Sequence, residues 1–355
     1  MISYEKIPFI ILAGENKGHY KEKEWKDKIR MNNKYDTKFL DGDKKLYYYL
    51  DNDKTVLENT IESILKFKYI DKEKSLVIGN KKKLRNLEEI INVIEQKGES
   101  LTDNIKQSLD YVYSKNYSGN SMIISGDIPA IKHSEISEFY SNALFKKTDL
   151  VSGMVDIKEM DFYNLKFFNS KKRKFRKFGI HFKDNSNFKR SNPKLTFGNI
   201  FLVNDMVYKN MNDLKERFQE LTSMKRVFND EKNYNGICNI LQDNNKIKEY
   251  PKTFPGLIKF SLFNSNLLRK MFFGNYLCKG RINYSVSLNE LEKIIESRIF
   301  ENKISFSVAR TPPTFGFDVD DKYDLIIANK FINDRDQNYF RNVLRLRNGR
   351  YKWKI

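Results

Sequence analysis

The chain has 355 residues, of which 40% are hydrophobic and 14% aromatic, so it can bury a substantial core and disorder throughout is excluded. A balance of 65 basic against 46 acidic residues gives a net charge of +19, which favours anionic partners: nucleotides, phosphorylated substrates, nucleic acid or an acidic membrane surface. The two cysteines, Cys238 and Cys278, lie too far apart in the sequence to indicate a disulfide framework or a cysteine zinc site. No signal peptide and no run of about 18 apolar residues is recognisable, so we expect a soluble cytoplasmic protein.

Short apolar runs alternate with amphipathic stretches over the first 155 residues. Buried strands are predicted at 7–13, 75–79, 121–125 and 150–155. Helices are predicted after Thr55, around 84–94 and over about 133–146. Residues 98–104 open a further helix that continues through Val112. The first of these helices begins with a capping box, since Glu58 follows Thr55 at the required spacing. This alternation is typical of an α/β fold whose mainly parallel sheet is covered by helices.

The third predicted strand ends at Ser125-Gly126, and Asp127 stands at its carboxyl end. Pro129 restricts the preceding residue to an extended shape, so Asp127 does not continue directly into a helix. A carboxylate in this position lies where open α/β sheets bind ligands. The alternative interpretation, an aspartate that caps the following turn, fits the same residues.

The first predicted strand runs into Ala13-Gly14, and Gly18 follows four residues later. A strand that leads into a glycine loop can present backbone N–H groups to a phosphate. A plain turn explains the same two glycines. Residues 15–46 are polar and rich in lysine, which is typical of a loop.

The second half of the chain is less regular. We expect a core over 1–250 with a basic insertion at about 158–194 and a helical insertion at 251–302. A return strand with an acidic motif and a helix follows at 303–334, and a basic tail at 335–355. A further strand is predicted at 195–203, helices over about 210–245, and a helix from Ser287.

The segment 254–277 is rich in Phe and Leu but carries too many basic residues to span a membrane. Its apolar residues surround much of a helix, so we expect it to pack against the domain or a second subunit. Peripheral contact with an acidic membrane is the alternative. The oligomeric state is left open.

Four stretches together resemble the MobA-like nucleoside triphosphate transferase family. Ile11-Leu12-Ala13-Gly14 is similar to the family's first strand and nucleotide loop, and Lys44-Lys45-Leu46 to its Lys-x-Leu motif. Ser125-Gly126-Asp127-Ile128-Pro129 resembles its metal-binding Asp-x-Pro, and residues 317–325 resemble its closing acidic motif. The resemblance covers about 1–205 and 303–332 and implies a Rossmann-like GT-A fold.

The resemblance also implies an activity and the residues that perform it. Such enzymes use Mg²⁺ to transfer NMP from an NTP to an acceptor and release pyrophosphate. Asp127 and Asp320 would bind the metal, with Asp318 as the substitute for Asp320, and Lys44 and Asp127 would be catalytic. The residues implied in nucleotide binding are Leu12, Ala13, Gly14, Lys44, Gly98, Ser100 and Asn104.

The sequence departs from the family pattern at three points. Glu15 brings negative charge into the glycine loop, Lys322 replaces a proline of the closing motif, and Lys38 fits the Lys-x-Leu motif as well as Lys44 does. The residue types still suit the chemistry, because Mg²⁺ prefers one or two carboxylates together with phosphates and water. Since the acceptor supplies the nucleophile, no catalytic Ser, Cys or His is required.

We therefore expect an enzyme whose partners are an NTP and a small phosphorylated or hydroxylated acceptor. One alternative is a protein of the same fold that binds a nucleotide or nucleotide-sugar without turnover, and another is a GT-A glycosyltransferase. Nucleic acid binding through the basic run 170–177 and the tail from Arg341 is a further alternative that we do not favour, because no recognised nucleic-acid-binding module is present.

Overall fold

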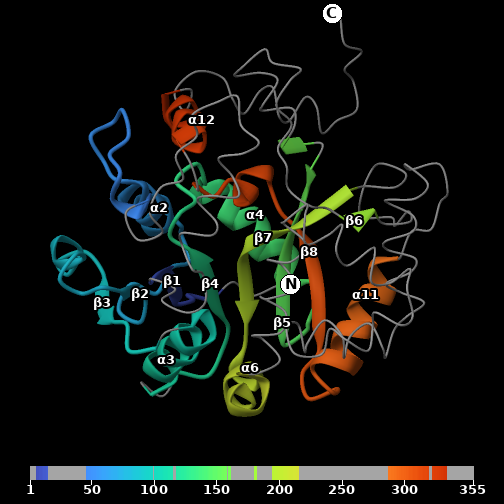
Figure 1. Cartoon of the computed structure of the whole chain (residues 1–355). Helices are drawn as coiled ribbons and strands as arrows, with labels where there is room; N and C mark the ends of the chain where they lie inside the picture. Colours follow the sequence, from blue (N-terminus) through green and yellow to red (C-terminus); the bar gives the residue numbers. More distant parts are fainter. Residues whose placement is uncertain are drawn as a thin grey trace, which may run out of the picture.

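A computed structural model describes residues 5–14, 45–98, 100–114, 117–157, 159–160, 180–181, 194–215, 287–319 and 322–333. Within them, eight strands form one sheet in the order β3-β2-β1-β4-β7-β5-β8, with β6 paired to β7 (Figure 1). The strands are β1 (Phe9–Ala13), β2 (Leu76–Gly79), β3 (Asn92–Glu95), β4 (Ser121–Ser125), β5 (Leu150–Asp156), β6 (Ile180–His181), β7 (Lys194–Val203) and β8 (Phe306–Arg310).

Strand β7 is the exception to an otherwise parallel main sheet. It pairs antiparallel with β4 on one side and with β5 on the other, whereas β1–β2, β1–β4, β2–β3 and β5–β8 are parallel pairs. Two antiparallel steps restore the original direction, so β5 and β8 run the same way as β1 to β4. The carboxyl ends of these six strands therefore meet at one edge of the sheet, where α/β proteins bind ligands.

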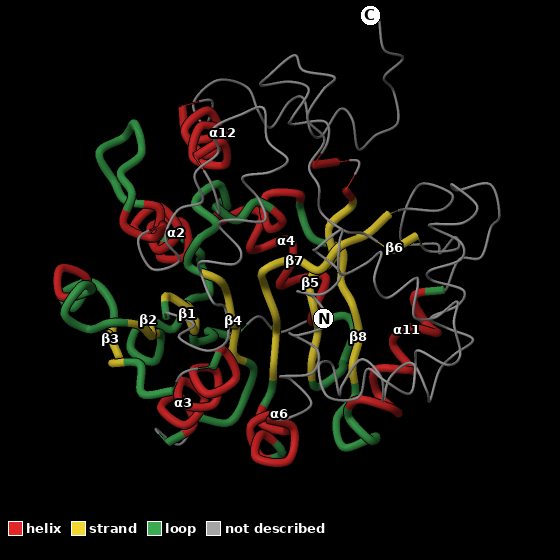
Figure 2. The backbone as a smooth tube through the Cα atoms, viewed as in Figure 1, coloured by secondary structure: helices red, strands yellow, loops and turns green. Residues whose placement is uncertain are grey.

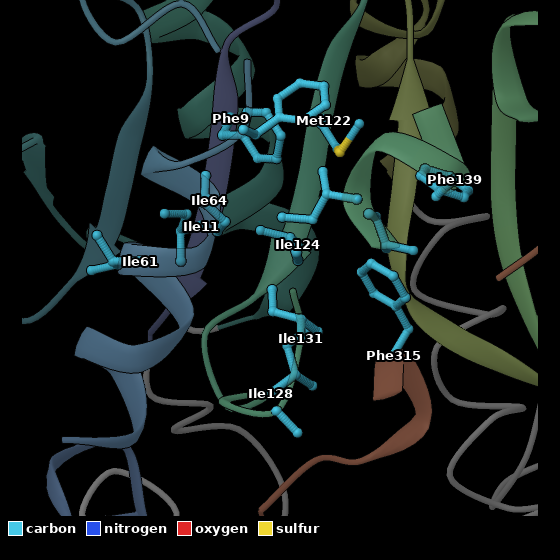
Figure 3. Close-up of a cluster of buried hydrophobic side chains, with 14 of the residues drawn as sticks. Phe9, Ile11, Ile61, Ile64, Met122, Ile124, Ile128, Ile131, Phe139 and Phe315 are labelled. Atoms are coloured by element: carbon cyan, nitrogen blue, oxygen red, sulfur yellow. The ribbon is translucent and has the colours of Figure 1, made fainter. Parts of the chain in front are cut away.

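Helices cover both faces of the sheet (Figure 2). One face packs against α3 (Leu101–Tyr113), α6 (Asp205–Lys209) and α11 (Leu288–Ile294), and the other against α2 (Val56–Leu65), α4 (His133–Leu144) and α12 (Lys322–Asn333). The alternating side chains of each strand serve the two faces in turn. Ile10 of β1 contributes to the first core and Ile11 to the second, where it lies near α2 (Figure 3). The expected α/β fold, a mainly parallel sheet covered by helices, is confirmed.

The helix predicted around 84–94 is wrong. The structure has a 3-10 turn there, η2 (Arg85–Leu87), followed by strand β3, which extends the sheet beside β2. Leu84, Leu87 and Ile91 are buried, and their spacing of three and four residues suggested a helix. Pairing of Val93 with Val77 overrides that local periodicity because it satisfies backbone hydrogen bonds along the edge of the sheet.

Other predicted elements are confirmed where the structure describes them. Helix α2 begins with the predicted capping box, in which Glu58 N donates to Thr55 Oγ1 at 3.2 Å and Thr55 N donates to Glu58 Oε2 at 2.7 Å. The helix from Ser287 forms as α11 and continues as a π-helical turn, Ile295–Ile299. Most of the basic insertion at 158–194, the predicted helices beyond 215, the segment 254–277 and the tail 335–355 lie outside the described residues. Among the described residues, no helix is long and apolar enough to cross a membrane.

Strand β8 is an edge strand of the sheet, so alternate backbone N–H groups of β8 point away from β5. Two carboxylates one helical turn apart receive them: Val308 N donates to Glu292 Oε1 at 2.8 Å, and Phe306 N donates to Glu296 Oε1 at 2.7 Å. Burial raises the pKa of Glu292, and the Val308 hydrogen bond opposes this shift. The side chains thus satisfy strand donors that would otherwise be left unpaired at a sheet edge.

Replacing Glu292 with leucine should lower the free energy of unfolding by about 1–3 kcal/mol, because Val308 N–H loses its acceptor in a half-buried place. Glu292→Gln is the matched control, since its amide oxygen can still accept that hydrogen bond. Urea unfolding followed by circular dichroism measures both variants. Equal destabilisation by leucine and glutamine would show that the Val308 hydrogen bond is not the cause.

Candidate functional site

Asp127 follows β4 at the carboxyl edge of the sheet and is 8% exposed. Lys45 Nζ lies 2.5 Å from Asp127 Oδ2, in an ion pair whose two side chains are 18% and 11% exposed. The hydroxyl of Ser125 donates to the other carboxylate oxygen, Oδ1. Both oxygens of the predicted metal ligand are therefore bound by donors from the protein itself.

Helix α2 holds the segment that carries Asp127. Thr60 Oγ1 donates to Gly126 O at 3.0 Å, and Ser63 Oγ donates to Ile131 O at 2.8 Å. Gly126 N in turn donates to Leu12 O of β1 at 2.9 Å. A Cβ at Gly126 would lie 2.8 Å from Leu57 Cδ1 and 3.1 Å from Leu12 O, so a larger residue would require the Leu57 side chain to shift. Ile128 and Ile131 of the same segment belong to the buried apolar cluster that Figure 3 shows.

The described part of the closing acidic motif lies beside Asp127. Val319 N donates to Asp127 O at 2.9 Å, which places Asp318 one residue from this contact. The motif is fixed by packing against α12, where the rings of Phe317 and Phe331 are 5.1 Å apart. Asp320, the second predicted metal ligand, lies outside the described residues, and within the described part of the chain no three His, Cys, Asp or Glu side chains gather as a metal cluster.

Three of the predicted nucleotide-binding residues gather around the end of β1. A Cβ on Gly14 would lie 2.7 Å from Asn104 Nδ2 and closer still to the side chain of Gln96. Gln96 Nε2 donates to Gly98 O at 2.7 Å, so Gly98 belongs to the same group. Asn104 is 3% exposed, and its Oδ1 has no hydrogen-bond partner among the described residues. A buried amide oxygen without a donor is costly, which indicates that a ligand or water completes this place.

Ser100 has a structural role in addition to any role in binding. It is the N-cap of α3: Asp103 N donates to Ser100 Oγ at 3.1 Å, and Ser100 Oγ donates to Asp103 Oδ2 at 2.7 Å. Hydrogen bonds from Lys215 and from Ser100 lower the pKa of Asp103, although burial opposes them. Leu12 and Ala13 form the end of β1, where the backbone of Leu12 anchors Gly126.

Sequence reasoning missed two residues of the site, Lys45 and Gln96. The motif spacing selected Lys44, which lies outside the described residues, whereas its neighbour Lys45 reaches Asp127. The apolar side chain of Leu46, which is buried in the structure, could have indicated that this end of the motif packs against the core. Gln96 follows β3, and the incorrect helix at 84–94 concealed that it stands at the end of a strand.

The residues present fit a Mg²⁺ site of the kind in which the protein supplies few ligands. Asp127 offers carboxylate oxygens at a strand end, and Asp318 precedes Val319, whose N–H donates to Asp127 O. Mg²⁺ bound with substrate phosphates commonly uses one or two carboxylates and keeps several waters. The donor set is compatible with such an ion, provided that the ammonium of Lys45 gives up its contact with Asp127.

Comparison with known proteins bears on the fold. No protein-family model matches the chain, and no curated protein matches it. Among solved structures, the chain is similar to a hypothetical transferase from Thermus thermophilus, with a TM-score of 0.53, 17% identity, and coverage of 90% of this chain and 99% of that one. This likeness shows a shared fold.

Two further structures match with lower TM-scores. One is CMP:2-keto-3-deoxy-manno-octonic acid synthetase complexed with CTP, with a TM-score of 0.40, 12% identity, and coverage of 62% of this chain and 85% of that one. The other is 4-diphosphocytidyl-2C-methyl-D-erythritol synthase from Anaerococcus prevotii, with a TM-score of 0.44, 10% identity, and coverage of 93% and 96%. The chemistry assigned to this chain therefore rests on its own residues.

Proposed function

We propose that this protein is a MobA-like, Mg²⁺-dependent nucleotidyltransferase, which transfers NMP from an NTP to a small phosphorylated or hydroxylated acceptor and releases pyrophosphate. The observation that carries the proposal is the arrangement at the carboxyl edge of the sheet. Asn104 Oδ1, in the first turn of α3, has no hydrogen-bond partner among the described residues and lies beside Gly14 at the end of β1. Asp127, paired with Lys45, follows β4, the parallel neighbour of β1. The fold shared with the hypothetical transferase from Thermus thermophilus is compatible with a transferase.

The group formed by Gly14, Gln96 and Asn104 is suited to a nucleotide base. Asn104 Oδ1 accepts a hydrogen bond, and the bases of NTPs carry amino or imino donors on their edges. Gly14 lets the backbone of β1 approach this group without a side chain in between. The base would lie at the end of β1, with its phosphates directed toward β4, the neighbouring strand.

The pair of Lys45 and Asp127 is suited to the phosphates. A Mg²⁺ ion held by Asp127 and the nucleotide would stabilise the negative charge that develops on the α-phosphate. The ammonium of Lys45, and that of Lys44 as the sequence predicts, would neutralise the charge on the departing pyrophosphate. The acceptor supplies the attacking oxygen, so the chain needs only to bind, orient and neutralise charge.

A screen of the four ribonucleoside triphosphates with Mg²⁺ against a panel of sugar phosphates and polyols tests the proposal. Pyrophosphate release reports turnover, and calorimetry reports binding. Release that depends on an acceptor supports nucleotidyl transfer. Binding of an NTP without release in any combination would instead favour a nucleotide-binding protein, and turnover of a nucleotide-sugar alone would favour a glycosyltransferase.

Asn104→Leu should weaken NTP binding by roughly 10-fold or more, because it removes the acceptor and fills the buried place with an apolar group. Calorimetry with the preferred NTP measures this change. Asp110→Asn on the exposed side of the same helix is the matched control, since Asp110 forms an ion pair with Lys106 on that surface. An unchanged dissociation constant in a folded Asn104→Leu variant would show that the base does not bind there.

A further inference from the structure

We propose that Lys45 occupies the cation position of Asp127 in the metal-free protein and leaves that position when a divalent cation binds. The inference relies on the proposed function for the identity of the anion that the displaced ammonium then meets, the triphosphate. It assigns to Lys45 two partners in succession, the Asp127 carboxylate before ligand binding and the phosphates after it. Lys45 is then a competitor of the cation at Asp127 and a ligand of the nucleotide.

The geometry of the pair carries this inference. The 2.5 Å separation of Lys45 Nζ and Asp127 Oδ2 places a full positive charge where a cation bound to Asp127 would be expected. Ser125 Oγ donates to Oδ1, the other carboxylate oxygen. The ammonium of Lys45 therefore contacts Oδ2, the oxygen that a cation would bind. Asp127 is also fixed through its carbonyl to Val319 N and through Gly126 to Leu12. The carboxylate is held in place, and the long side chain of Lys45 is the part of the pair that can move.

Electrostatics make the two cations competitors. A mostly buried carboxylate gains from one adjacent positive charge, but a second one at the same oxygen is repelled by the first. Moving the ammonium of Lys45 away from Asp127 gives up the attraction of that carboxylate, which is unfavourable unless another anion takes its place. A triphosphate supplies that anion. Divalent cation and nucleotide are therefore expected to bind cooperatively, with weak cation binding in the absence of nucleotide.

Lys45→Met tests the exchange because methionine keeps an unbranched, apolar stem and removes the charge. Free Mn²⁺ is titrated by electron paramagnetic resonance against the full-length protein without nucleotide. We expect Lys45→Met to bind Mn²⁺ at least 10-fold more tightly than the parent, because the competing ammonium is gone. Lys45→Gln serves as the second variant, and a thermal melt by circular dichroism confirms that each is folded.

Two controls isolate the effect. Lys54→Met removes the same charge from the exposed pair with Glu62, and it should bind Mn²⁺ like the parent. Adding Asp127→Asn to Lys45→Met should abolish the gain. The inference is overturned if both folded Lys45 variants bind Mn²⁺ no more tightly than the parent, or if the tighter binding survives the loss of Asp127.

The outcome is separable from that of the proposed function. If the parent binds no NTP but Lys45→Met gains Mn²⁺ affinity through Asp127, the exchange stands and the nucleotidyltransferase assignment fails. If the parent turns over NTP but neither Lys45 variant gains Mn²⁺ affinity, the assignment stands and the exchange fails. With both correct, a non-hydrolysable NTP should tighten Mn²⁺ binding more in the parent than in Lys45→Met.

Discussion

Asp127→Asn is expected to reduce NTP turnover by roughly 100- to 1,000-fold, because metal stabilisation of phosphoryl charge contributes several kcal/mol to such reactions. The amide keeps the size of the side chain and can still accept from Ser125, but it cannot neutralise a cation. Pyrophosphate release at saturating NTP measures the loss. The variant should still melt cooperatively, because the bonds of Gly126 to Leu12 and Thr60 involve backbone atoms that the substitution retains.

Asp71→Asn is the matched control for this loss. Asp71 also forms an ion pair with a lysine, Lys74, at 3.1 Å, but it precedes β2 and so lies at the opposite, amino edge of the sheet. Its replacement removes a carboxylate of comparable exposure without approaching the candidate site. Turnover by Asp127→Asn at the rate of the parent would show that Asp127 holds no catalytic cation.

Glu135 should make the protein less stable as the pH rises from about 4.5 to 7. It lies in the first turn of α4, is 7% exposed, and accepts hydrogen bonds from Thr314 Oγ1 at 2.8 Å and Lys132 N at 3.0 Å. Burial raises the pKa of Glu135 from 4.5 to about 7, although the Thr314 hydroxyl and the charge of Lys132 lower it, and Glu138 adds to the increase.

The direction follows from proton linkage. Between pH 4.5 and 7 the folded protein keeps a proton on Glu135 that the unfolded chain has released. Stability from this group is therefore fully present below pH 4.5 and is lost as the pH rises through 7. Over that range the free energy of unfolding should fall by roughly 3 kcal/mol relative to a variant that cannot titrate there.

Glu135→Gln provides that variant, because it keeps the acceptor oxygen for Thr314 and has no ionisable proton in this range. Urea unfolding of parent and variant at half-unit steps from pH 4.5 to 8 measures the difference. Glu62→Gln is the control: hydrogen bonds from Lys54 and Lys66 lower the pKa of Glu62 to about 2, so its titration alters stability only below pH 4.5. Parallel pH profiles for the parent and Glu135→Gln would contradict the prediction.

Much of the fold could be predicted because its signals are local. The buried strands β1, β2, β4 and β5 are short apolar runs, and the capping box at Thr55 depends on a residue three positions further on. The position of Asp127 after a buried strand was also predicted, since the strand and the x-Pro pair that follows are visible in a single stretch. The helix at 84–94 failed because β3 is stabilised by its pairing with β2, which no local periodicity records.

The sequence by itself determined that this chain forms an α/β sheet and that Asp127, Gly14 and Asn104 stand at or just beyond the ends of its elements. Tertiary structure decided which side chains meet there. It placed the ammonium of Lys45 on Asp127 and left the Asn104 amide oxygen without a partner among the described residues. It also inserted β7 antiparallel between β4 and β5. These outcomes depend on contacts between residues far apart in the chain. Such contacts stabilise the protein only when the sheet has formed and helices cover its two faces.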